Sequence, residues 1–337
     1  METGLSLAHK VAALRDPSSY PDRPARVEAI ETHFAWVFLT GGHAYKLKKP
    51  LRLKGADLRT LDAREQNCQE ELSVNRRLAA DTYLRVAPLA CHDARLVVDG
   101  PGEVADWLVV MRELDRRQML NARLQAGRVE PADIDRIVQA LARFYRGLTP
   151  AVSDAQAYVG SVRARIDEAV SELSRPEFGL PPDPVRELAC SLRAAGRRSA
   201  AGLAARVGEG RVVEAHGDLR AEHVWLGDPI QVIDALEFDR RLRILDTAEE
   251  IAMLAVDLEH HGFTETAGEL VERYRQVLPD AVPAALLAFY ESLRAATRAK
   301  IAIWHLDDAS QYPDGAPWRQ RALEFATLAI RAAGRAA

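Results

Sequence analysis

Cysteine is scarce in this chain of 337 residues, which contains only Cys68, Cys91 and Cys190. Their number is odd, they lie far apart, and none of their spacings is typical of a metal site, which argues against a disulfide framework or a zinc module. We expect unpaired thiols in a reducing compartment. The amino terminus also lacks the charged-then-apolar plan of a signal peptide, so the expected location is cytoplasmic.

Long apolar runs and an excess of positive charge are absent as well. No run approaches the ~20 residues that cross a bilayer, so we expect no membrane-spanning segment. The net charge of −4 gives no sign of the basic face that nucleic acid demands. With 48% hydrophobic and 28% charged residues, the composition is that of an ordinary globular protein. The length allows two domains or one large two-lobed domain.

The chemistry-bearing residues are concentrated in residues 212–258. An apolar pair leads into His216-Gly217-Asp218, and two short β-type runs joined by a Gly-Asp-Pro turn predict a hairpin that ends at Asp234. We expect Asp218 and Asp234 to face one another across a small gap. Such a pair suits phosphoryl transfer, since one carboxylate can accept the proton of an attacking hydroxyl while the other holds Mg²⁺.

This stretch resembles the catalytic loop of kinase-like folds, in which His-x-Asp is followed by Asn and then by a strand ending in a metal-binding Asp. His216, Asp218 and Asp234 match, and His223 stands where Asn is expected. The motifs His-Gly-Asp-Leu and Ile-Asp-x-x-Glu-Phe resemble those of the aminoglycoside phosphotransferase and choline kinase superfamily more than those of the protein kinases. Within it, the chain resembles an uncharacterised aminoglycoside phosphotransferase-like branch. The resemblance covers roughly residues 28–305.

The resemblance implies an α+β, two-lobed protein-kinase-like fold. Residues 1–25 would form a strap, residues 26–114 a small antiparallel-sheet N-lobe with one helix, and residues 115–337 a mainly helical C-lobe. That C-lobe would carry the catalytic hairpin, with a catalytic loop at 216–223 and a metal-binding segment at 234–237. Some relatives are fused to an ATP-binding domain, but no Gly-x-x-x-x-Gly-Lys-Ser/Thr loop occurs here, so a separate ATPase is a possible partner.

The N-lobe pattern starts with three strands, at residues 27–31, 36–40 and 43–48. Alternation places Lys46 and Lys48 on the same face of the third strand. Ala44-Tyr45-Lys46 resembles the strand whose lysine meets the nucleotide phosphates, which implies that role for Lys46, with Lys48 as the fallback. The alternative is an exposed basic edge strand that discourages aggregation.

Further strands are expected at residues 84–90, 95–98 and 107–111, after a charged helix at residues 60–79 with Leu61, Cys68, Leu72 and Leu78 inward. In that helix Glu71 is implied to orient the strand lysine, because it shares the side of Leu78. The turn after the first strand contains no glycine, so the amides of Thr32 and His33 would have to serve the phosphates. The hinge that would hold a purine comprises Arg112, Glu113 and Leu114.

In the C-lobe, the helical segments at 131–147, 152–174 and 184–205 are expected to be scaffold. Thr247-x-x-Glu250 predicts a capping box that begins a helix at Ala248. The resemblance implies that Asp246 and Glu250 brace the catalytic loop, and Arg220 is assigned to the same supporting group.

The implied mechanism uses Asp218 as the base, Asp234 as the Mg²⁺ ligand and His216 to order the loop. Imidazole suits Mn²⁺ or Zn²⁺ better than Mg²⁺. Three outcomes therefore stay open: Glu237 supplies the second metal contact, which we favour, or His223 binds the metal, or catalysis is lost. The donor would be ATP or GTP, with Mn²⁺ as a possible replacement for Mg²⁺, and the acceptor a hydroxyl of a small molecule that the sequence does not identify.

Two other classes of function stay open. A degenerate kinase would bind nucleotide without transferring phosphate. A metal-dependent hydrolase built from the two histidines and the two aspartates of the motif would hold Zn²⁺ or Mn²⁺ and would be indifferent to Lys46. The acidic residues expected around the site are compatible with a cationic substrate; they are Asp218, Asp234, Glu237, Glu249 and Glu250.

Overall fold

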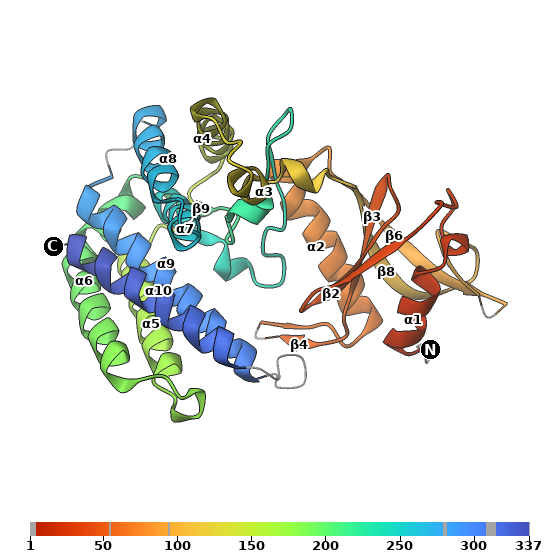
Figure 1. Ribbon diagram of the computed structural model, residues 1–337, viewed down its shortest axis with the longest axis horizontal. Coiled ribbons are helices and arrows are strands. Elements are labelled where there is room, and N and C mark those ends of the chain that lie inside the picture. Colours follow the sequence, from red (N-terminus) through yellow and green to blue (C-terminus); the bar gives the residue numbers. More distant parts are fainter. Residues whose placement is uncertain (1–4, 54, 94, 279–281, 308–314, 337) are drawn as a thin grey trace. The chain divides into compact units, whose positions relative to one another are not determined.

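The computed structural model describes residues 5–53, 55–93, 95–278, 282–307 and 315–336. The chain forms two compact units (Figure 1). The first contains Met1–Ala122 and His223–Leu242, and the second contains Arg123–Glu222 and Arg243–Ala337. Among the described residues, no helix combines the length and the hydropathy that crossing a bilayer requires.

An antiparallel sheet with the strand order β1-β2-β3-β8-β6-β7 forms the frame of the first unit. Its strands are β1 (Glu28–Glu31), β2 (Ala35–Leu39), β3 (His43–Lys48), β6 (Tyr83–His92), β7 (Arg95–Val98) and β8 (Glu103–Arg112). A short hairpin, β4 (Arg52–Leu53) with β5 (Ala56–Asp57), follows β3. All the expected strands are present, and β6 and β8 are longer than their sequence patterns indicated.

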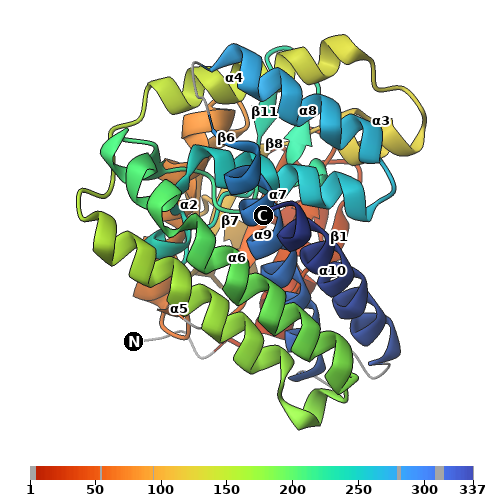
Figure 2. The same ribbon diagram turned by 90° about the vertical axis from the view of Figure 1, so that its left-hand side faces the viewer.

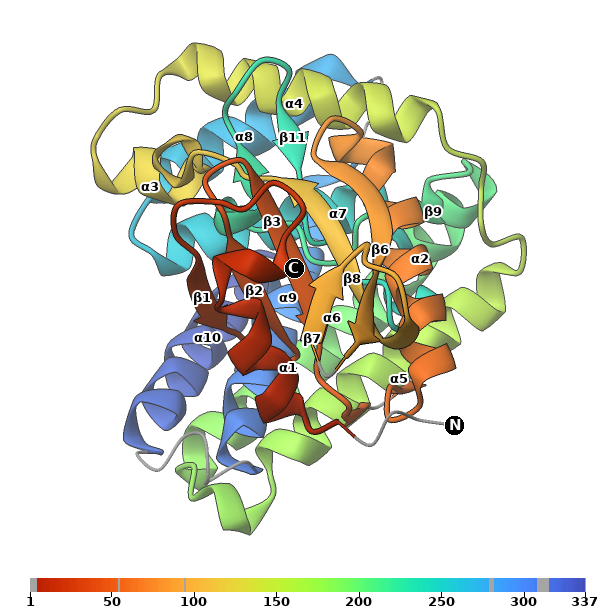
Figure 3. The same ribbon diagram turned by 90° about the vertical axis from the view of Figure 1, so that its right-hand side faces the viewer.

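The two faces of the sheet are covered by different helices, as Figures 1 and 3 show. On one face, Tyr45 and Leu47 of β3 join an apolar core to which α1 (Leu7–Leu14) contributes Val11 and Leu14. Residues near the amino terminus are thus part of this core. On the other face lies α2 (Leu61–Ala79). Strand alternation places Lys46 and Lys48 on the same face, as predicted, and that face is the one that α2 covers.

The inner face of α2 differs from the expected one. Leu61, Leu72 and Leu78 are only partly buried. The buried face is instead rich in polar side chains, namely Arg64, Asn67, Glu71 and Asn75, with Cys68 and Val74 among them. Polar residues can line this face because their partners, including the two lysines of β3, are polar too.

The segment His223–Leu242 packs with the first unit, whereas the sequence placed it in the C-lobe. It contains the expected hairpin, in which β10 (Val224–Trp225) pairs with β11 (Gln231–Val232). Hydrogen bonds explain the grouping: Thr82 bonds to Gln231, and the Leu226 amide donates to Gln118 O at 2.8 Å.

The second unit is mainly helical, as expected. Its helices are α3 (Leu120–Gln125, which starts just before the unit), α4 (Pro131–Arg146), α5 (Ala155–Leu173), α6 (Pro182–Gly208), α7 (Thr247–His260), α8 (Thr264–Val277), α9 (Ala284–Trp304) and α10 (Ala316–Arg335). Helices α5, α6, α9 and α10 pack side by side (Figure 2). A two-stranded ladder of β9 (Val212–Glu214) and β12 (Ile244–Asp246) brings the strand that leads into His216-Gly217-Asp218 beside the start of α7.

Candidate functional site

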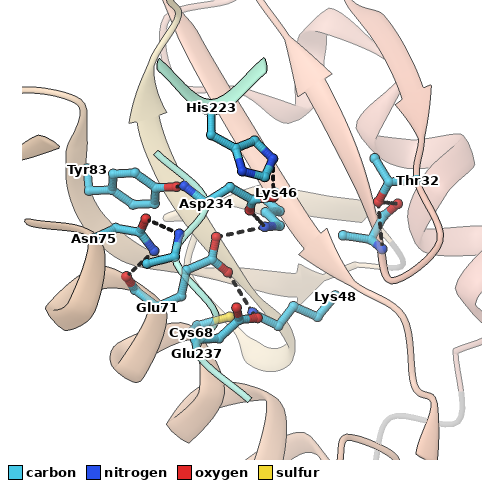
Figure 4. Close-up of polar contacts among 12 residues, drawn as sticks. Thr32, Lys46, Lys48, Cys68, Glu71, Asn75, Tyr83, His223, Asp234 and Glu237 are labelled. Atoms are coloured by element: carbon cyan, nitrogen blue, oxygen red, sulfur yellow. Dashed lines mark hydrogen bonds and ion pairs between the residues drawn. The ribbon is translucent and has the colours of Figure 1, made fainter. Parts of the chain in front are cut away.

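Two lysines and three carboxylates form a network on the α2 side of the sheet (Figure 4). Lys46 Nζ lies 2.8 Å from Glu71 Oε1 and 2.9 Å from Asp234 Oδ1. Lys48 Nζ lies 2.6 Å from Glu71 Oε2 and pairs with Glu237 as well. Glu71 is completely buried, whereas the Asp234 side chain is 47% exposed. The network therefore joins a buried anchor to a carboxylate that a ligand can reach.

Charge pairing dominates the ionisation of this network. Burial alone would lower the pKa of Lys46, but Asp234, Glu71 and Glu237 together raise it well above its usual value. Burial would raise the pKa of Glu71, and the two lysines reverse that effect and lower it. Both partners are therefore held in their charged forms at neutral pH.

The position of β3 in the sheet rules out the alternative hypothesis, in which Lys46 lies on an exposed edge strand. Strand β3 pairs with β2 on one side and with β8 on the other, with Val37 and Val109 opposite Lys46. An edge strand has one unpaired side, and β3 has none. The lysine thus lies in the middle of the sheet.

Asp234 has a backbone conformation that side chains rarely adopt, with φ at +65°. Asp tolerates this left-handed region better than most residues, but it still costs energy. The Asp234 amide donates to Tyr83 Oη at 3.1 Å, and the next amide, that of Ala235, donates to Asn75 Oδ1 at 2.8 Å. Two buried side chains therefore fix the backbone that presents the Asp234 carboxylate.

His223 is buried beside Asp234, with Nε2 at 3.6 Å from Oδ2. Glu237, the favoured second metal ligand, is paired with Lys48. Among the described residues, no group of three or more His, Cys, Asp or Glu side chains is placed to hold a metal ion. This donor set does not fit a resident all-protein metal cage. It fits Mg²⁺ that is bound by one or two carboxylates together with substrate phosphates, the usual arrangement in kinases.

Several backbone amides of the expected phosphate turn and of the expected hinge already donate hydrogen bonds within the protein. The Thr32 amide donates to Ala35 O at 2.8 Å, and the Thr32 hydroxyl bonds to Ala35 as well (Figure 4), so this amide is not available to phosphate. His33 lies at the same turn and packs edge-on against Phe34. In the hinge, the amides of Arg112 and Glu113 donate to Thr82 O and Gly42 O. Of the three predicted hinge amides, only that of Leu114 has no hydrogen-bond partner among the described residues.

In the second unit, Glu250 braces the loop that carries the His-Gly-Asp motif. Its Oε1 accepts the amides of His216 at 2.8 Å and Gly217 at 2.7 Å, and its Oε2 accepts the Tyr145 hydroxyl at 2.8 Å. Burial raises the pKa of Glu250, although these hydrogen bonds oppose the shift. Gly217 has φ at +91°, a conformation that favours glycine, so the loop needs glycine between His216 and Asp218.

The predicted capping box at Thr247 and Glu250 is wrong. The helix begins one residue earlier, with Asp246 as its N-cap, whose side chain accepts the Ala248 amide. Asp246 also accepts Arg206 Nη2 at 2.7 Å and the Tyr290 hydroxyl. Glu250 is thereby left to hold the loop rather than its own helix end.

Arginines surround Asp218 within the second unit. Arg220, assigned to the supporting group, pairs with Glu222 at 2.5 Å and lies 3.5 Å from Asp257. Sequence reasoning missed Arg298, whose Nη1 lies 4.0 Å from Asp218 Oδ1, and Arg294, which donates to Gly217 O. Both lie on α9, about eighty residues beyond the motif, and no local pattern points to them.

The expectation of an acidic surround is wrong for the part of the second unit that is described. Glu249 is fully buried between Arg165 and Arg294, and Glu250 accepts hydrogen bonds from the loop amides.

Sequence reasoning also missed Asn75 and Tyr83, which hold the backbone at Asp234. Asn75 had a detectable signal, because it lies four residues after Glu71 and so on the same side of α2.

Comparisons with known proteins fit this geometry. No family model matches the chain. It is 35% identical over 281 residues to uncharacterized proteins of Mycobacterium bovis and Mycobacterium tuberculosis, which cover 82% of this chain. The chain spans about half the length, 54%, of these curated relatives.

Three solved structures with a similar fold are described as kinases or phosphotransferases of small molecules. A choline/ethanolamine kinase family protein from Mesorhizobium loti gives a TM-score of 0.53 at 16% identity, covering 96% of this chain and 99% of its own. An ethanolamine kinase from Plasmodium vivax gives 0.53 at 10% identity, with coverages of 90% and 82%. The GDP complex of an aminoglycoside 2′-phosphotransferase gives 0.51 at 16% identity, with coverages of 94% and 97%.

The chain therefore has the protein-kinase-like fold that choline/ethanolamine kinases and aminoglycoside phosphotransferases share, an α+β fold with an antiparallel-sheet N-lobe and a helical C-lobe. The predicted fold is confirmed, and the similarity to these kinases and phosphotransferases is a similarity of fold.

Proposed function

We propose that this protein is a phosphotransferase that moves the γ-phosphate of ATP or GTP to a hydroxyl group of a small molecule. The observation that carries the proposal is the Lys46–Glu71–Asp234 arrangement. A strand lysine, oriented by a buried glutamate, reaches a partly exposed carboxylate at the end of a hairpin. Phosphoryl transfer depends chiefly on positioning and on neutralisation of charge, which these groups supply.

In the proposed reaction, Lys46 contacts phosphate oxygens of the nucleotide and Glu71 keeps its ammonium group in place. Asp234, with His223 or Glu237 beside it, would hold Mg²⁺ (or Mn²⁺), which would supply positive charge against the phosphates. Asp218 accepts the proton of the acceptor hydroxyl. A weak base suffices for this step, because the proton leaves late in a loose transition state.

His216 and Glu250 have positioning roles in this proposal. The two amides held by Glu250 fix the backbone on the amino-terminal side of Asp218. The Asp218 amide in turn lies 3.3 Å from His216 Nδ1. A loop fixed in this way presents the carboxylate of Asp218 without a rearrangement during the reaction.

The test is calorimetric titration with ATP and GTP, each with Mg²⁺ and with Mn²⁺, followed by an assay of phosphate transfer to a panel of hydroxylated compounds. Asp234→Asn should abolish metal-dependent nucleotide binding. Asp218→Asn should leave nucleotide binding within about twofold and lower the transfer rate by about 10²-fold or more. A folded protein that binds neither nucleotide under any condition would refute the proposal.

A second candidate is a degenerate kinase, and the substitution of His for Asn at position 223 favours it. Nucleotide binding without metal, with no transfer to any acceptor, would support this candidate. His223→Asn then offers a direct comparison, because it restores the amide oxygen that Mg²⁺ prefers. A gain of metal-dependent binding or transfer in His223→Asn would show that position 223 limits the wild-type protein.

The hydrolase candidate receives less support. Its ligands would have to form a resident site for Zn²⁺ or Mn²⁺, and no such cluster occurs in the described part of the chain. It also gives no role to the buried pairing of Lys46 with Glu71.

A further inference from the structure

The arginine beside the proposed base has unused hydrogen-bonding capacity. Arg298, on α9, carries five N–H donors in a planar fork. Across the described residues it forms no hydrogen bond: its Nε is buried without a partner, and the nearest carboxylate oxygen, Asp218 Oδ1, is 4.0 Å away. Its guanidinium carbon lies over the Phe325 ring, 5.7 Å from the ring centroid, which is within the range of a cation–π contact.

The Nε atoms of Arg220 and Arg294 are also buried without a hydrogen-bond partner, so these neighbouring arginines differ from Arg298 at their terminal nitrogens. Arg220 has Glu222 and Asp257 as partners. Arg294 donates to Glu249 at 3.3 Å and to the Gly217 carbonyl at 3.3 Å. Both of these arginines have roles inside the protein, and both add positive charge near Asp218. Of the three, Arg298 alone keeps its fork available for something that the chain itself does not provide.

Arg298 is also held in surroundings that disfavour its charge. Burial, and then the charge of Arg220, lower the pKa of Arg298. Its side chain nevertheless keeps 16% of its surface exposed, so a ligand can reach it. An oxyanion bound to the guanidinium would replace the hydrogen bonds to water that burial removes, and its negative charge would offset the repulsion from Arg220. A planar carboxylate or a phosphate matches the two parallel N–H donors of the guanidinium.

We propose that the acceptor is a hydroxyl-bearing anion, a hydroxy carboxylate or a phosphorylated alcohol, whose oxyanion is held by Arg298 while its hydroxyl meets Asp218. This inference rests on the proposed phosphotransferase function and gives it a substrate class. The acceptor differs in charge from the choline, ethanolamine and aminoglycoside compounds named for the structural neighbours. It is consistent with the second unit, where the glutamates that could attract a cation are paired with arginines or with the backbone.

The reaction balances without a further reactant. The acceptor oxygen forms a bond to the γ-phosphorus of the nucleoside triphosphate as the bond from that phosphorus to the β–γ bridging oxygen breaks. The hydroxyl proton passes to Asp218, and the nucleoside diphosphate leaves with the bridging oxygen. Arg298 takes no part in the bond changes; it binds and orients the acceptor.

The test compares four small acceptors of similar size: glycerate, glycerol phosphate, neutral glycerol and cationic choline. Binding is measured by calorimetry in the presence of Mg²⁺ and ADP, and transfer is measured with ATP. The variants are Arg298→Gln, which removes the charge, and Arg298→Lys, which keeps the charge but loses the fork. Arg331→Gln is the matched control, because it removes an arginine ion pair, with Glu259, from the surface of the same unit.

We expect one or both anions to bind and to be phosphorylated in preference to glycerol and choline. Arg298→Gln should raise the KM or Kd of the anion by about tenfold or more, with kcat and the KM for glycerol within about twofold, and Arg298→Lys should fall between. A preference for glycerate over glycerol phosphate, or the reverse, identifies the oxyanion. Arg331→Gln should behave as the wild type does.

Three outcomes would overturn the inference while ATP binding and transfer stay intact. They are a preference for choline, an Arg298→Gln effect on kcat alone for every acceptor, and anion binding that Arg298→Gln does not change. Failure of anion binding in a protein that binds ATP with Mg²⁺ would also overturn it. Loss of ATP binding itself would instead refute the proposed function. If Arg298→Gln does not fold, the KM ratio between anionic and neutral acceptors in Arg298→Lys gives the same decision.

Discussion

Lys46 and Asp234 are separated by 188 positions in the chain, yet Lys46 Nζ lies 2.9 Å from Asp234 Oδ1. The contact joins the middle of the sheet to the end of a hairpin within one compact unit. Glu71 of α2 completes it from the buried side at 2.8 Å. A cation placed between a buried anion and an exposed one can exchange the exposed partner for phosphate without losing the buried one.

Replacement of this lysine tests that exchange. Lys46→Met removes the ammonium group and keeps the length of the side chain, so we expect nucleotide affinity to fall by about tenfold to a hundredfold. Lys300→Met is the control, because Lys300 has an ion pair of its own, with Glu168 at 2.9 Å, in the other unit. Calorimetry with ATP and Mg²⁺ measures both. Equal ATP affinities in the two variants would show that Lys46 does not contact the nucleotide.

The Tyr83 hydroxyl, which accepts the Asp234 amide, gives a second prediction. Tyr83→Phe removes this acceptor from a backbone held at a positive φ, so the free energy of unfolding should fall by about 1 kcal/mol and metal-dependent nucleotide binding should weaken. Tyr274→Phe removes a buried hydroxyl contact to Thr247 in the second unit. It should cost similar stability and leave binding unchanged. If both variants lose binding equally, Tyr83 acts only through general stability.

The elements of the first unit could be predicted from sequence because their signals are local. Strand alternation assigned Lys46 and Lys48 to one face of β3, and the Gly-Asp-Pro turn indicated the β10–β11 hairpin. The inner face of α2 could not be predicted from apolar residues, because what it buries is Glu71 and Asn75 rather than leucines. Their burial depends on lysines that lie elsewhere in the chain, so apolar periodicity carries no signal of it.

The same limit applies to the second unit. The His-Gly-Asp motif pointed to the loop, but the capping box at Thr247 was wrong because Asp246 and Glu250 are both used by tertiary partners. Asp246 caps the helix and binds Arg206, and Glu250 holds the loop amides. A local motif cannot reveal which of several acidic residues will find such a partner. Arg298 was missed for the same reason, as its only relation to Asp218 is spatial.

The ionisation of Glu71 predicts a contribution to stability at acid pH. Because the two lysines lower its pKa below the usual value of 4.5, the native state holds the charged form more strongly than the unfolded state does. This stabilisation is fully present above pH 4.5 and is lost as the pH falls through the lower pKa of the folded protein. Glu71→Gln should therefore be less stable than the wild type at neutral pH, and the difference should shrink in acid.

Chemical denaturation of both proteins between about pH 3 and pH 7 measures that difference. Glu70→Gln, at the neighbouring position of the same helix, measures what the loss of a carboxylate from α2 contributes by itself. A constant difference between Glu71→Gln and the wild type at all these pH values would mean that Glu71 contributes through packing and not through its charge.

The support of the motif loop by Glu250 gives the last prediction. Its carboxylate accepts two backbone amides and a tyrosine hydroxyl while fully buried, so Glu250→Ala leaves buried donors without a partner. We expect the free energy of unfolding to fall by about 3 kcal/mol or more, and phosphate transfer to be lost, because the loop no longer fixes Asp218. Tyr145→Phe keeps both amide bonds, so it should cost about 1 kcal/mol and retain transfer. Denaturation curves and the transfer assay on both variants separate the two contributions. Full transfer in Glu250→Ala at a temperature where it is folded would show that the loop holds its conformation without this carboxylate.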